Sequence, residues 1–266
     1  MFFKKSKNQE LKKNLFWWEP ADGKTQNAGD HLSRVIVERM LDLYDKQLDE
    51  KLSKKNKLLA IGSVMHFAKD ADTIWGTGIN GKVPDNTHKF QKLDVRAVRG
   101  PLTKNYLEKK GIKCPSVYGD PGLLLPFFYA EELLSENGRV NDFMIIPHMN
   151  ESLESYSKFK GKIIHPCQGA ISFTREILSS KFIVSSSLHG IIIAEAYGIP
   201  AVCLQNKSGE AEFKYQDYYM GSGRDAFPIA TTIEEGLEMI PAELPDVKNI
   251  GGNLMKSFPY DLWIEK

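Results

Sequence analysis

His189 and the serines before it carry side chains that could act in catalysis or binding. They stand in the segment Lys181–Leu204, KFIVSSSLHGIIIAEAYGIPAVCL, where a β-branched run, a polar turn and two further apolar runs follow one another. This order predicts a strand, a tight turn that contains His189, a helix and a second strand. Unpaired N–H groups at such a helix start attract anions, and open α/β sheets bind ligands at this edge. One interpretation is therefore an anion site beside a titratable imidazole.

Two other interpretations apply to the same segment. A structural histidine, buried in a core or placed at a helix start, would give the same pattern, and periodicity alone does not separate it from a reactive one. A membrane span would need about 20 mostly apolar residues without interruption. Three serines, His189, Glu195 and Pro200 interrupt this segment, so the sequence disfavours a span and leaves the other two interpretations open.

The elements on either side alternate strand and helix patterns, which predicts parallel sheets with both faces covered. An amphipathic helix capped by Asn27 or Asp30 follows the first strand, and a helix with Pro101 in its first turn follows the fourth. In the first half, strands with their turns are predicted at residues 15–18, 57–63, 73–78, 94–101 and 116–122. In the second half, strands are predicted at residues 143–148, 162–166, 182–184 and 201–204, and helices at residues 169–178, 191–197 and 231–240.

Residues 131–141 are polar and are predicted to link two halves of similar size. The fold class expected from the pattern is α/β, with two Rossmann-like domains facing a cleft. The N-terminal domain would comprise residues 1–130 and the C-terminal domain residues 131–248, with a loop and short helix at 205–224 near the cleft. The amphipathic segment 249–266 would pack back on the N-terminal domain. Such an architecture alone fixes no function.

Small and polar residues stand at the ends of the predicted strands, where a ligand can approach the backbone closely. Arg99, at the fourth strand end, offers a rigid fork of donors for phosphate or carboxylate, and Arg96 is a second cation on that strand. Turns, helix caps and surface ion pairs use the same residue types, so each signal has a structural alternative. The other candidate binding residues are Asn27, Gly29, Asp30, Gly62, Ser63, Gly76, Gly78, Ser187, Leu188 and Gly190.

Composition narrows the class of protein. The chain has 266 residues, a net charge of +1 and 42% hydrophobic residues, as in ordinary globular domains, and no global positive field favours nucleic acid as a partner. Cys114, Cys167 and Cys203 are far apart and fit free thiols in a reducing compartment. The first residues lack the apolar run of a signal peptide. We therefore expect a cytoplasmic protein, with lysine runs that allow at most peripheral contact with the inner face of the membrane.

Six short motifs follow one another along the chain. They are Asn27-Ala28-Gly29-Asp30, Ala60-Ile61-Gly62-Ser63, Trp75-Gly76-Thr77-Gly78, Val98-Arg99-Gly100-Pro101, Gly119-Asp120-Pro121-Gly122, and Ser187-Leu188-His189-Gly190 with the run 194–200 after it. In this order they resemble the polysaccharide pyruvyl transferase family, of the exopolysaccharide-biosynthesis type. Each motif is weak alone, but the similarity spans residues 15–204, and residues 258–261 resemble endings of exopolysaccharide members.

The resemblance implies a fold like that of GT-B glycosyltransferases, with the active site between two Rossmann-like domains. It implies an enzyme that moves the pyruvate moiety of phosphoenolpyruvate onto two hydroxyls of a sugar, giving a cyclic ketal and free phosphate. Phosphoenolpyruvate would be the donor substrate, and no cofactor is expected. No metal is expected either, since His66, His148, His165 and His189 lie on separate segments without metal-site spacing.

The resemblance also assigns roles. His189 would be catalytic, as the general acid that protonates the methylene carbon of the donor, and Arg99 would hold the donor's anionic groups. One position departs from a better studied branch of the family, which has an arginine two positions before this histidine, where this chain has Ser187. Serine supplies no charge. Either another cation, Arg96, Arg175 or Arg224, takes over, or the donor is held differently, or the activity has drifted.

Three hypotheses follow. The leading one is a pyruvyl transferase acting on a lipid-linked or nucleotide-linked saccharide in exopolysaccharide or capsule biosynthesis. The alternative is a GT-B-type glycosyltransferase that uses a nucleotide sugar, because the inferred fold permits it. The third is a non-catalytic member of a polysaccharide assembly complex, because a fold by itself carries no activity. The sequence identifies neither the acceptor sugar, the ketal positions, the stereochemistry nor the oligomeric state.

Overall fold

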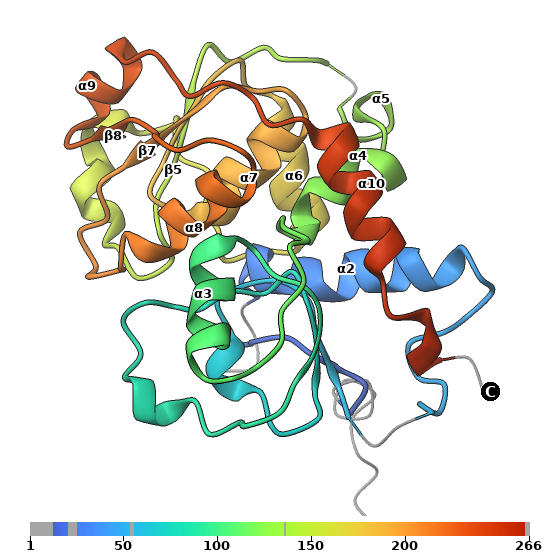
Figure 1. Ribbon diagram of the computed structural model, residues 1–266. Coiled ribbons are helices and arrows are strands. Elements are labelled where there is room, and N and C mark those ends of the chain that lie inside the picture. Colours follow the sequence, from blue (N-terminus) through green and yellow to red (C-terminus); the bar gives the residue numbers. More distant parts are fainter. Residues whose placement is uncertain (1–12, 21–25, 54–55, 136, 264–266) are drawn as a thin grey trace, which may run out of the picture.

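Two four-stranded parallel sheets form the framework of the protein (Figure 1). This computed structural model describes residues 13–20, 26–53, 56–135 and 137–263. The first sheet has the strand order β1 (Leu15–Phe16), β2 (Leu58–Leu59), β3 (Thr73–Trp75) and β4 (Asp94–Ala97). The second has the order β5 (Met144–Ile146), β6 (Ile183–Ser185), β7 (Ala201–Leu204) and β8 (Ile229–Ala230). All neighbouring strands are parallel, so the predicted α/β class and the parallel sheets are confirmed.

Two of the predicted strands do not form. Residues 116–122 contribute a single bridge, from Tyr118 to the residue after β4. Gly119, at a φ of +138°, then turns the chain into the short 3-10 helix η3 (Pro121–Leu124), so no further pairing follows. Residues 162–166 likewise give one bridge to β5. The sequence also missed β8, because a two-residue strand is too short to show an alternation.

Three elements meet at the centre of the molecule: α2 (Ala28–Asp42), α7 (Leu188–Ala196) and η3. α7 is apolar on all sides, which is typical of a helix enclosed by the core. All nine of its residues are described, and only His189 is not buried. The other α-helices of the described residues are α3 (Pro101–Lys109), α4 (Leu125–Phe128), α5 (Glu131–Leu134), α6 (Ala170–Leu178), α8 (Phe213–Gly221), α9 (Ile233–Glu238) and α10 (Val247–Ser257).

Helix α8, from the second half of the chain, packs directly on the start of α3 in the first half. Two glycines permit this contact: a Cβ on Gly100 would lie 1.8 Å from the carbonyl oxygen of Asp217, and one on Gly221 would lie 2.0 Å from that of Arg99. No side chain fits at such distances, so the backbones touch only because both residues are glycine. The glycine of the Val98–Pro101 motif therefore has a packing role.

The C-terminal segment returns to the first half, as Figure 1 shows for α10 beside α4 and α2. Helix α10 contacts η3 and β4, and the indole N–H of Trp75 donates to the carbonyl of Leu254 at 2.9 Å. Tyr260 donates to the carbonyl of Met40 at 3.1 Å. These contacts bring residues from the end of the described chain against the sheet that the start of the chain forms.

One cluster of buried apolar side chains extends through both halves, from Leu15 to Trp263. The cysteines Cys114, Cys167 and Cys203 are free thiols, as predicted. Among the described residues, no helix combines the length and the apolar composition that crossing a bilayer requires.

Candidate active site

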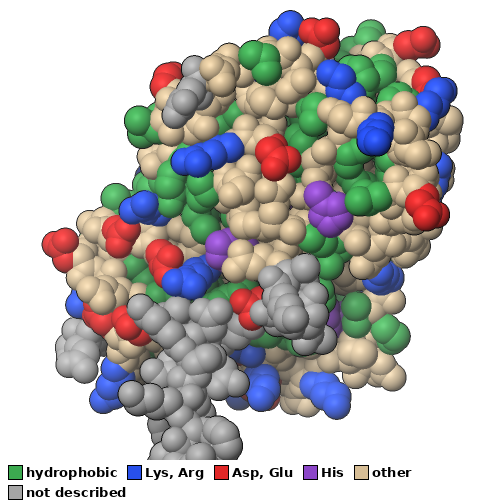
Figure 2. Space-filling model, turned by 180° about the vertical axis from the view of Figure 1, so that it is seen from behind, with side chains coloured by type: hydrophobic (Ala, Val, Ile, Leu, Met, Phe, Trp, Pro, Cys, Tyr) green, Lys and Arg blue, Asp and Glu red, His purple; other side chains and the backbone are tan. Residues whose placement is uncertain are grey.

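A cavity of about 320 Å³ lies between the two halves of the chain. Its walls come from the start of α2 and the ends of β2 and β3 on one side, and from the loop after β5 and the starts of α7 and α8 on the other. The volume is in the range of sites for small molecules, roughly 300–1,000 Å³. In the space-filling view, histidine side chains show near the middle of the back face, with Lys or Arg side chains nearby (Figure 2).

His189 lines this cavity and lies in the first turn of α7. The prediction that the turn continues to Gly190 is wrong: the helix begins at Leu188 and its N-cap is Ser187. Ser187 needs no charge for that role. The hydroxyl of Ser185 accepts from the N–H of Ser187 at 3.0 Å and donates to the carbonyl of Ser187 at 2.9 Å, which fixes the backbone where β6 passes into α7.

Asp120 and Gly29 hold the imidazole of His189 from two sides. Its Nε2 lies 3.7 Å from Oδ2 of Asp120, and neither of these two buried atoms has a hydrogen-bond partner in the structure. A Cβ on Gly29 would lie 2.0 Å from Nδ1, so only glycine fits there. Nε2 thus faces the carboxylate and Nδ1 lies on the side of Gly29, so a proton transfer to a bound molecule would use Nδ1.

Asp30, in the first turn of α2, lines the cavity as well. Asn27 is the N-cap, and its side chain accepts from the N–H of Asp30 at 3.1 Å, so the predicted cap is confirmed. Burial raises the pKa of Asp30 from 3.8 to about 6, against the opposing attraction of His189 and Lys214, and Asp120 adds to the rise. This carboxyl group therefore titrates in a range where it can take up a proton during a reaction.

The starts of three helical elements converge on this corner of the site. Asn27 caps α2, Ser187 is the N-cap of α7, and Asp120 caps η3 by accepting from the N–H of Gly122 at 2.9 Å. The first N–H groups of a helix have no intrahelical partner, and the helix dipole adds partial positive charge there. These helix starts add partial positive charge near His189, opposite in sign to the carboxylates of Asp30 and Asp120 beside it.

Two lysines and a carboxylate also line the cavity. Lys82 comes from the loop after β3, Lys214 from the start of α8, and Glu210 from the loop before that helix; all three line the cavity. Glu210 binds both lysines, Lys214 at 2.8 Å. Burial and Lys214 lower the pKa of the neighbouring His148 to about 4, so this imidazole is neutral at pH 7.

Arg99 does not line the cavity, although the sequence singled it out. Its guanidinium is fully buried and donates to Asp217 at 3.1 Å, to the carbonyl of Ile79 at 2.8 Å and to the hydroxyl of Ser63 at 2.7 Å. Ser63 does line the cavity, next to Gly62. Arg99 therefore stands behind Ser63, and Asp217 neutralises its charge.

The other arginines weighed from the sequence also lie outside the cavity lining. Arg96 donates to Asp94 and Asp261 at the far end of β4. Arg224 forms a buried pair with Glu195 at 2.7 Å, and Arg175 is an exposed residue of α6. Among the described residues, the cations of the cavity wall other than histidines are thus Lys82 and Lys214.

Of the remaining sequence candidates, Leu188 lines the cavity and three glycines do not. A Cβ on Gly76 would lie 2.2 Å from the ring of Pro121, one on Gly78 2.4 Å from the guanidinium carbon of Arg99, and one on Gly190 2.6 Å from the hydroxyl of Ser185. These glycines allow elements behind the cavity to pack closely, which is a structural role in place of the predicted ligand contact.

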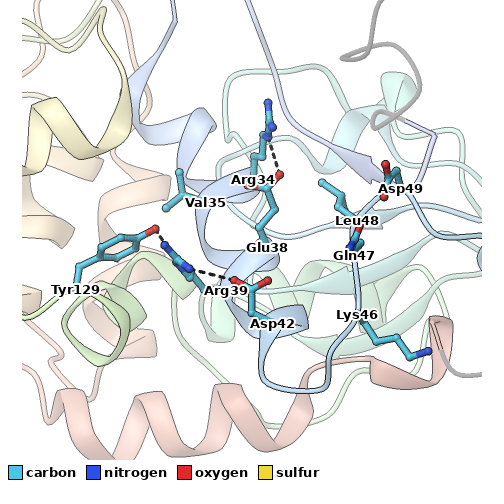
Figure 3. A pocket seen from close by; sticks show the side chains of 10 residues that line it. All are labelled: Arg34, Val35, Glu38, Arg39, Asp42, Lys46, Gln47, Leu48, Asp49 and Tyr129. Carbon is cyan, nitrogen blue, oxygen red and sulfur yellow. Dashed lines mark hydrogen bonds and ion pairs between the residues drawn. The ribbon is translucent and has the colours of Figure 1, made fainter.

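A second cavity, of about 340 Å³, lies along α2 (Figure 3). Four of its charged side chains pair with one another: Arg39 donates to Asp42 at 3.1 Å and also to the hydroxyl of Tyr129 at 2.9 Å, and Arg34 donates to Glu38 at 2.9 Å. No histidine lines it in the described part of the chain. Partly exposed ion pairs of this kind are common on protein surfaces, so we place the candidate active site in the first cavity.

The sequence missed most of the polar residues of the site. Asp120 belongs to a motif that was recognised, and its place before Pro121 could have marked it as a cap. His148 follows directly on β5 and could have been found at its strand end. Lys82, Glu210 and Lys214 belong to no motif, so no sequence signal marks them. Among the described residues, no group of three His, Cys, Asp or Glu side chains could hold a metal ion.

Comparison with known proteins agrees with the order of motifs. A family model described as polysaccharide pyruvyl transferase matches residues 27–208. The chain belongs to this family. An uncharacterized protein of Acanthamoeba polyphaga mimivirus is 27% identical over 231 residues, 81% of this chain and 79% of that protein. The succinoglycan biosynthesis protein ExoV of Rhizobium meliloti is 25% identical over 215 residues, 76% of this chain and 63% of ExoV.

The family is one of transferases, and the matched range includes Asn27, Asp30, Lys82, Asp120, His148, Ser187 and His189. Lys214 and Glu210 follow the matched range. A solved structure of an uncharacterized protein from Klebsiella pneumoniae covers 80% of this chain and 89% of its own, at 14% identity and a TM-score of 0.45.

Proposed function

We propose that the protein is a pyruvyl transferase that moves the pyruvate moiety of phosphoenolpyruvate onto a saccharide as a cyclic ketal. The observation that carries the proposal is the placement of His189, the one residue of α7 that is not buried, at the wall of a cavity beside Asp120 and Asp30. Membership in the polysaccharide pyruvyl transferase family supports the same reaction class. A histidine with only a core role would not need an opening next to it.

The reaction needs a proton on the methylene carbon of phosphoenolpyruvate. We assign that proton to His189, through Nδ1, while Asp120 attracts the positive charge on the ring. Two sugar hydroxyls then bond in turn to the central carbon, and the bond from that carbon to the phosphate oxygen breaks. Of the two hydroxyl protons, one replaces the proton that His189 gave, and the other leaves on the phosphate.

Asp30 is the proposed base for the attacking hydroxyl. Its carboxyl lies at the cavity wall, and its pKa of about 6 leaves it ionised at pH 7 yet more basic than an ordinary aspartate. The partly exposed aromatic rings of Trp18 and Phe67 line the same cavity on the side of the first sheet. Flat aromatic faces suit the C–H faces of a sugar ring, so we place the acceptor against them.

Replacing Asp30 by Asn should remove the acid limb of the pH profile. We expect the acid side of the kcat/KM profile of the wild type to rise with pH through about 6, because only the ionised carboxylate of Asp30 accepts a proton. Asp30→Asn should lower the rate by about 100-fold or more and show no such limb. The measurement is phosphate release between pH 4.5 and 8. The same limb in the Asn variant would assign it to another group.

Stability gives an independent check on Asp30. Its pKa is higher in the folded than in the unfolded state, so the native protein binds more protons between about pH 4 and 6. The free energy of unfolding should therefore fall as pH rises through this range, and Asp30→Asn should remove that part of the slope. Urea unfolding at several pH values measures it, whether or not the substrate is known.

Further features of the proposal concern the setting of the reaction. We propose a GT-B-like arrangement in which residues 1–130 and 131–248 form the two domains and the segment after residue 248 packs on the first. The acceptor is proposed to be a lipid-linked or nucleotide-linked saccharide of exopolysaccharide or capsule synthesis, which the similarity to ExoV supports. Catalysis is proposed without a cofactor, in the cytoplasm or at the inner face of the membrane.

The test is to incubate the protein with phosphoenolpyruvate and a panel of saccharides. We expect release of phosphate that depends on the saccharide, together with a product whose mass has increased by one pyruvate ketal. Thermal-shift measurements separate this function from nucleotide-sugar glycosyl transfer. Stabilisation by nucleoside diphosphates but not by phosphoenolpyruvate would overturn the proposal.

A further inference from the structure

We propose that Lys82 and Lys214 bind an anionic group of the donor, and that Glu210 occupies their binding position until the donor arrives. The inference rests on the proposed function, since it assigns the cations that hold phosphoenolpyruvate in the same cavity. It also names the cations that would replace the arginine that a branch of the family has at the position of Ser187. The charge would come from the loop after β3 and the start of α8 instead of from the start of α7.

The carboxylate of Glu210 lies between the ammonium groups of Lys82 and Lys214. Oε1 of Glu210 contacts Nζ of Lys82, and Oε2 lies 2.8 Å from Nζ of Lys214. One carboxylate thus bridges two ammonium groups that come from different halves of the chain. A carboxylate or phosphate of a bound ligand presents the same arrangement of neighbouring oxygens. Glu210 therefore has the position and the chemistry of a built-in substitute for such a group.

The charges of Lys82, Lys214 and Glu210 do not cancel. Glu210 neutralises only one of the two lysines, and His148, 3.9 Å from its Oε1, adds no charge at pH 7. Glu151 is engaged by the hydroxyls of Ser186 and Tyr156 and by the backbone N–H of Lys207. Within this cluster one positive charge remains, and Asp30, the other carboxylate of the cavity lining, attracts Lys214 from the start of α2. A phosphate dianion would neutralise both lysines, so exchange of Glu210 for the donor improves the balance.

Glu210 stands in a loop and can move away from the lysines, while Lys214 is held in place by its helix. Lys214 lies in the first turn of α8, and Asp217 of that helix is held by Arg99 before α3 and by Thr103 within α3. Glu210 belongs to the loop between β7 and α8, where Gly209 has a φ of +78° and the N–H of Glu210 is held by the side chain of Asn206. A short polar loop of this kind can rearrange without disturbing the helix.

A buried charge must stay paired, so Glu210 and the donor compete for the two lysines. Burial opposes ionisation of Glu210, yet the two lysines hold its pKa at about 2, and burial lowers the pKa of Lys214 despite Glu210. Lys214, 7% exposed, needs a counterion there, whereas Lys82 is 42% exposed and reaches solvent. Donor binding thus costs the loss of the Glu210 contacts, and the affinity for the donor depends on the strength of that internal pair.

The experiment measures binding of phosphoenolpyruvate by isothermal titration calorimetry, so it needs no acceptor. We expect Glu210→Gln to tighten binding by about tenfold, because the competing charge is removed, and Lys82→Gln to weaken it by about tenfold. The matched controls are Lys181→Gln and Asp142→Asn, which alter an exposed pair on another surface with side chains 60% and 86% exposed. Both controls should bind like the wild type.

A purely structural role for Glu210 would lower the melting temperature without tightening binding, and that result would overturn the inference. So would unchanged affinity in Lys82→Gln. The proposed function fails separately. If the wild type released phosphate from phosphoenolpyruvate but neither variant changed its binding, only the lysine pair would be wrong. If uridine diphosphate bound in place of phosphoenolpyruvate and both variants shifted its affinity as predicted, the lysine pair would stand and the proposed function would fall.

Discussion

Substitution of His189 by Ala should lower the rate of phosphate release from phosphoenolpyruvate by about 100-fold to 10,000-fold, the range that a positioned general acid contributes. The imidazole is the titratable side chain between Asp120 and the cavity, and without it no proton donor faces the methylene carbon from α7. Binding of phosphoenolpyruvate should change much less, because the lysines and the helix starts remain. The measurement is a phosphate-release assay at saturating acceptor, with calorimetry for binding.

His165→Ala is the matched control for this prediction. His165 is exposed, lies outside the cavity lining, and uses Nδ1 to accept from the N–H of Cys167 at 3.1 Å. It should retain the wild-type rate. Wild-type turnover in His189→Ala would show that this histidine is not the acid. An equal loss in both variants would indicate that removal of any imidazole disturbs the fold.

The sequence predicted the parts of the site that depend on local signals. The cap at Asn27 was readable because a capping side chain precedes a helical stripe, and the structure confirms it. Seven of the predicted strands form, since β-branched and aromatic runs bounded by glycine or polar residues mark buried parallel strands. The motif order also indicated the family, which the comparison confirmed.

The remaining features depend on contacts between distant residues. Arg99 was predicted to face the donor, but its partner Asp217 lies 118 positions further along the chain, and no local pattern announces that pair. Lys82 and Glu210 are 128 positions apart and stand in loops whose composition resembles any solvated surface. A sequence shows which side chains carry charge; only the fold decides whether that charge meets a partner or an opening.

These distant pairs also connect the fold to the site. The buried contact between α3 and α8 places Lys214 at the cavity, while Arg99 reaches Ser63 from behind the same wall. A change that loosens α8 should therefore act on the donor side before it acts on His189, which depends on α2, α7 and η3 instead. The arginine of the Val98–Pro101 motif supports the site from behind.

Asp217→Asn should destabilise the protein by about 3–5 kcal/mol, the usual cost of leaving one partner of a buried ion pair without its counterion. Both side chains are fully buried, and Asp217 also accepts from the N–H and the hydroxyl of Thr103, at 3.0 Å and 2.6 Å. Asn can keep part of these hydrogen bonds but cannot balance the guanidinium of Arg99. Urea unfolding measures the change in free energy.

An exposed pair of the same chemistry supplies the control. Arg39 and Asp42 lie 3.1 Å apart with side chains 47% and 56% exposed, so Asp42→Asn should cost about 1 kcal/mol or less. Equal losses in the two variants would contradict the role given to the buried pair. Joint replacement of Arg99 by Met and Asp217 by Leu should recover part of the stability, because no unpaired charge then remains. Without the pair, α8 loses its polar attachment to α3, and phosphoenolpyruvate should bind more weakly even where the protein stays folded.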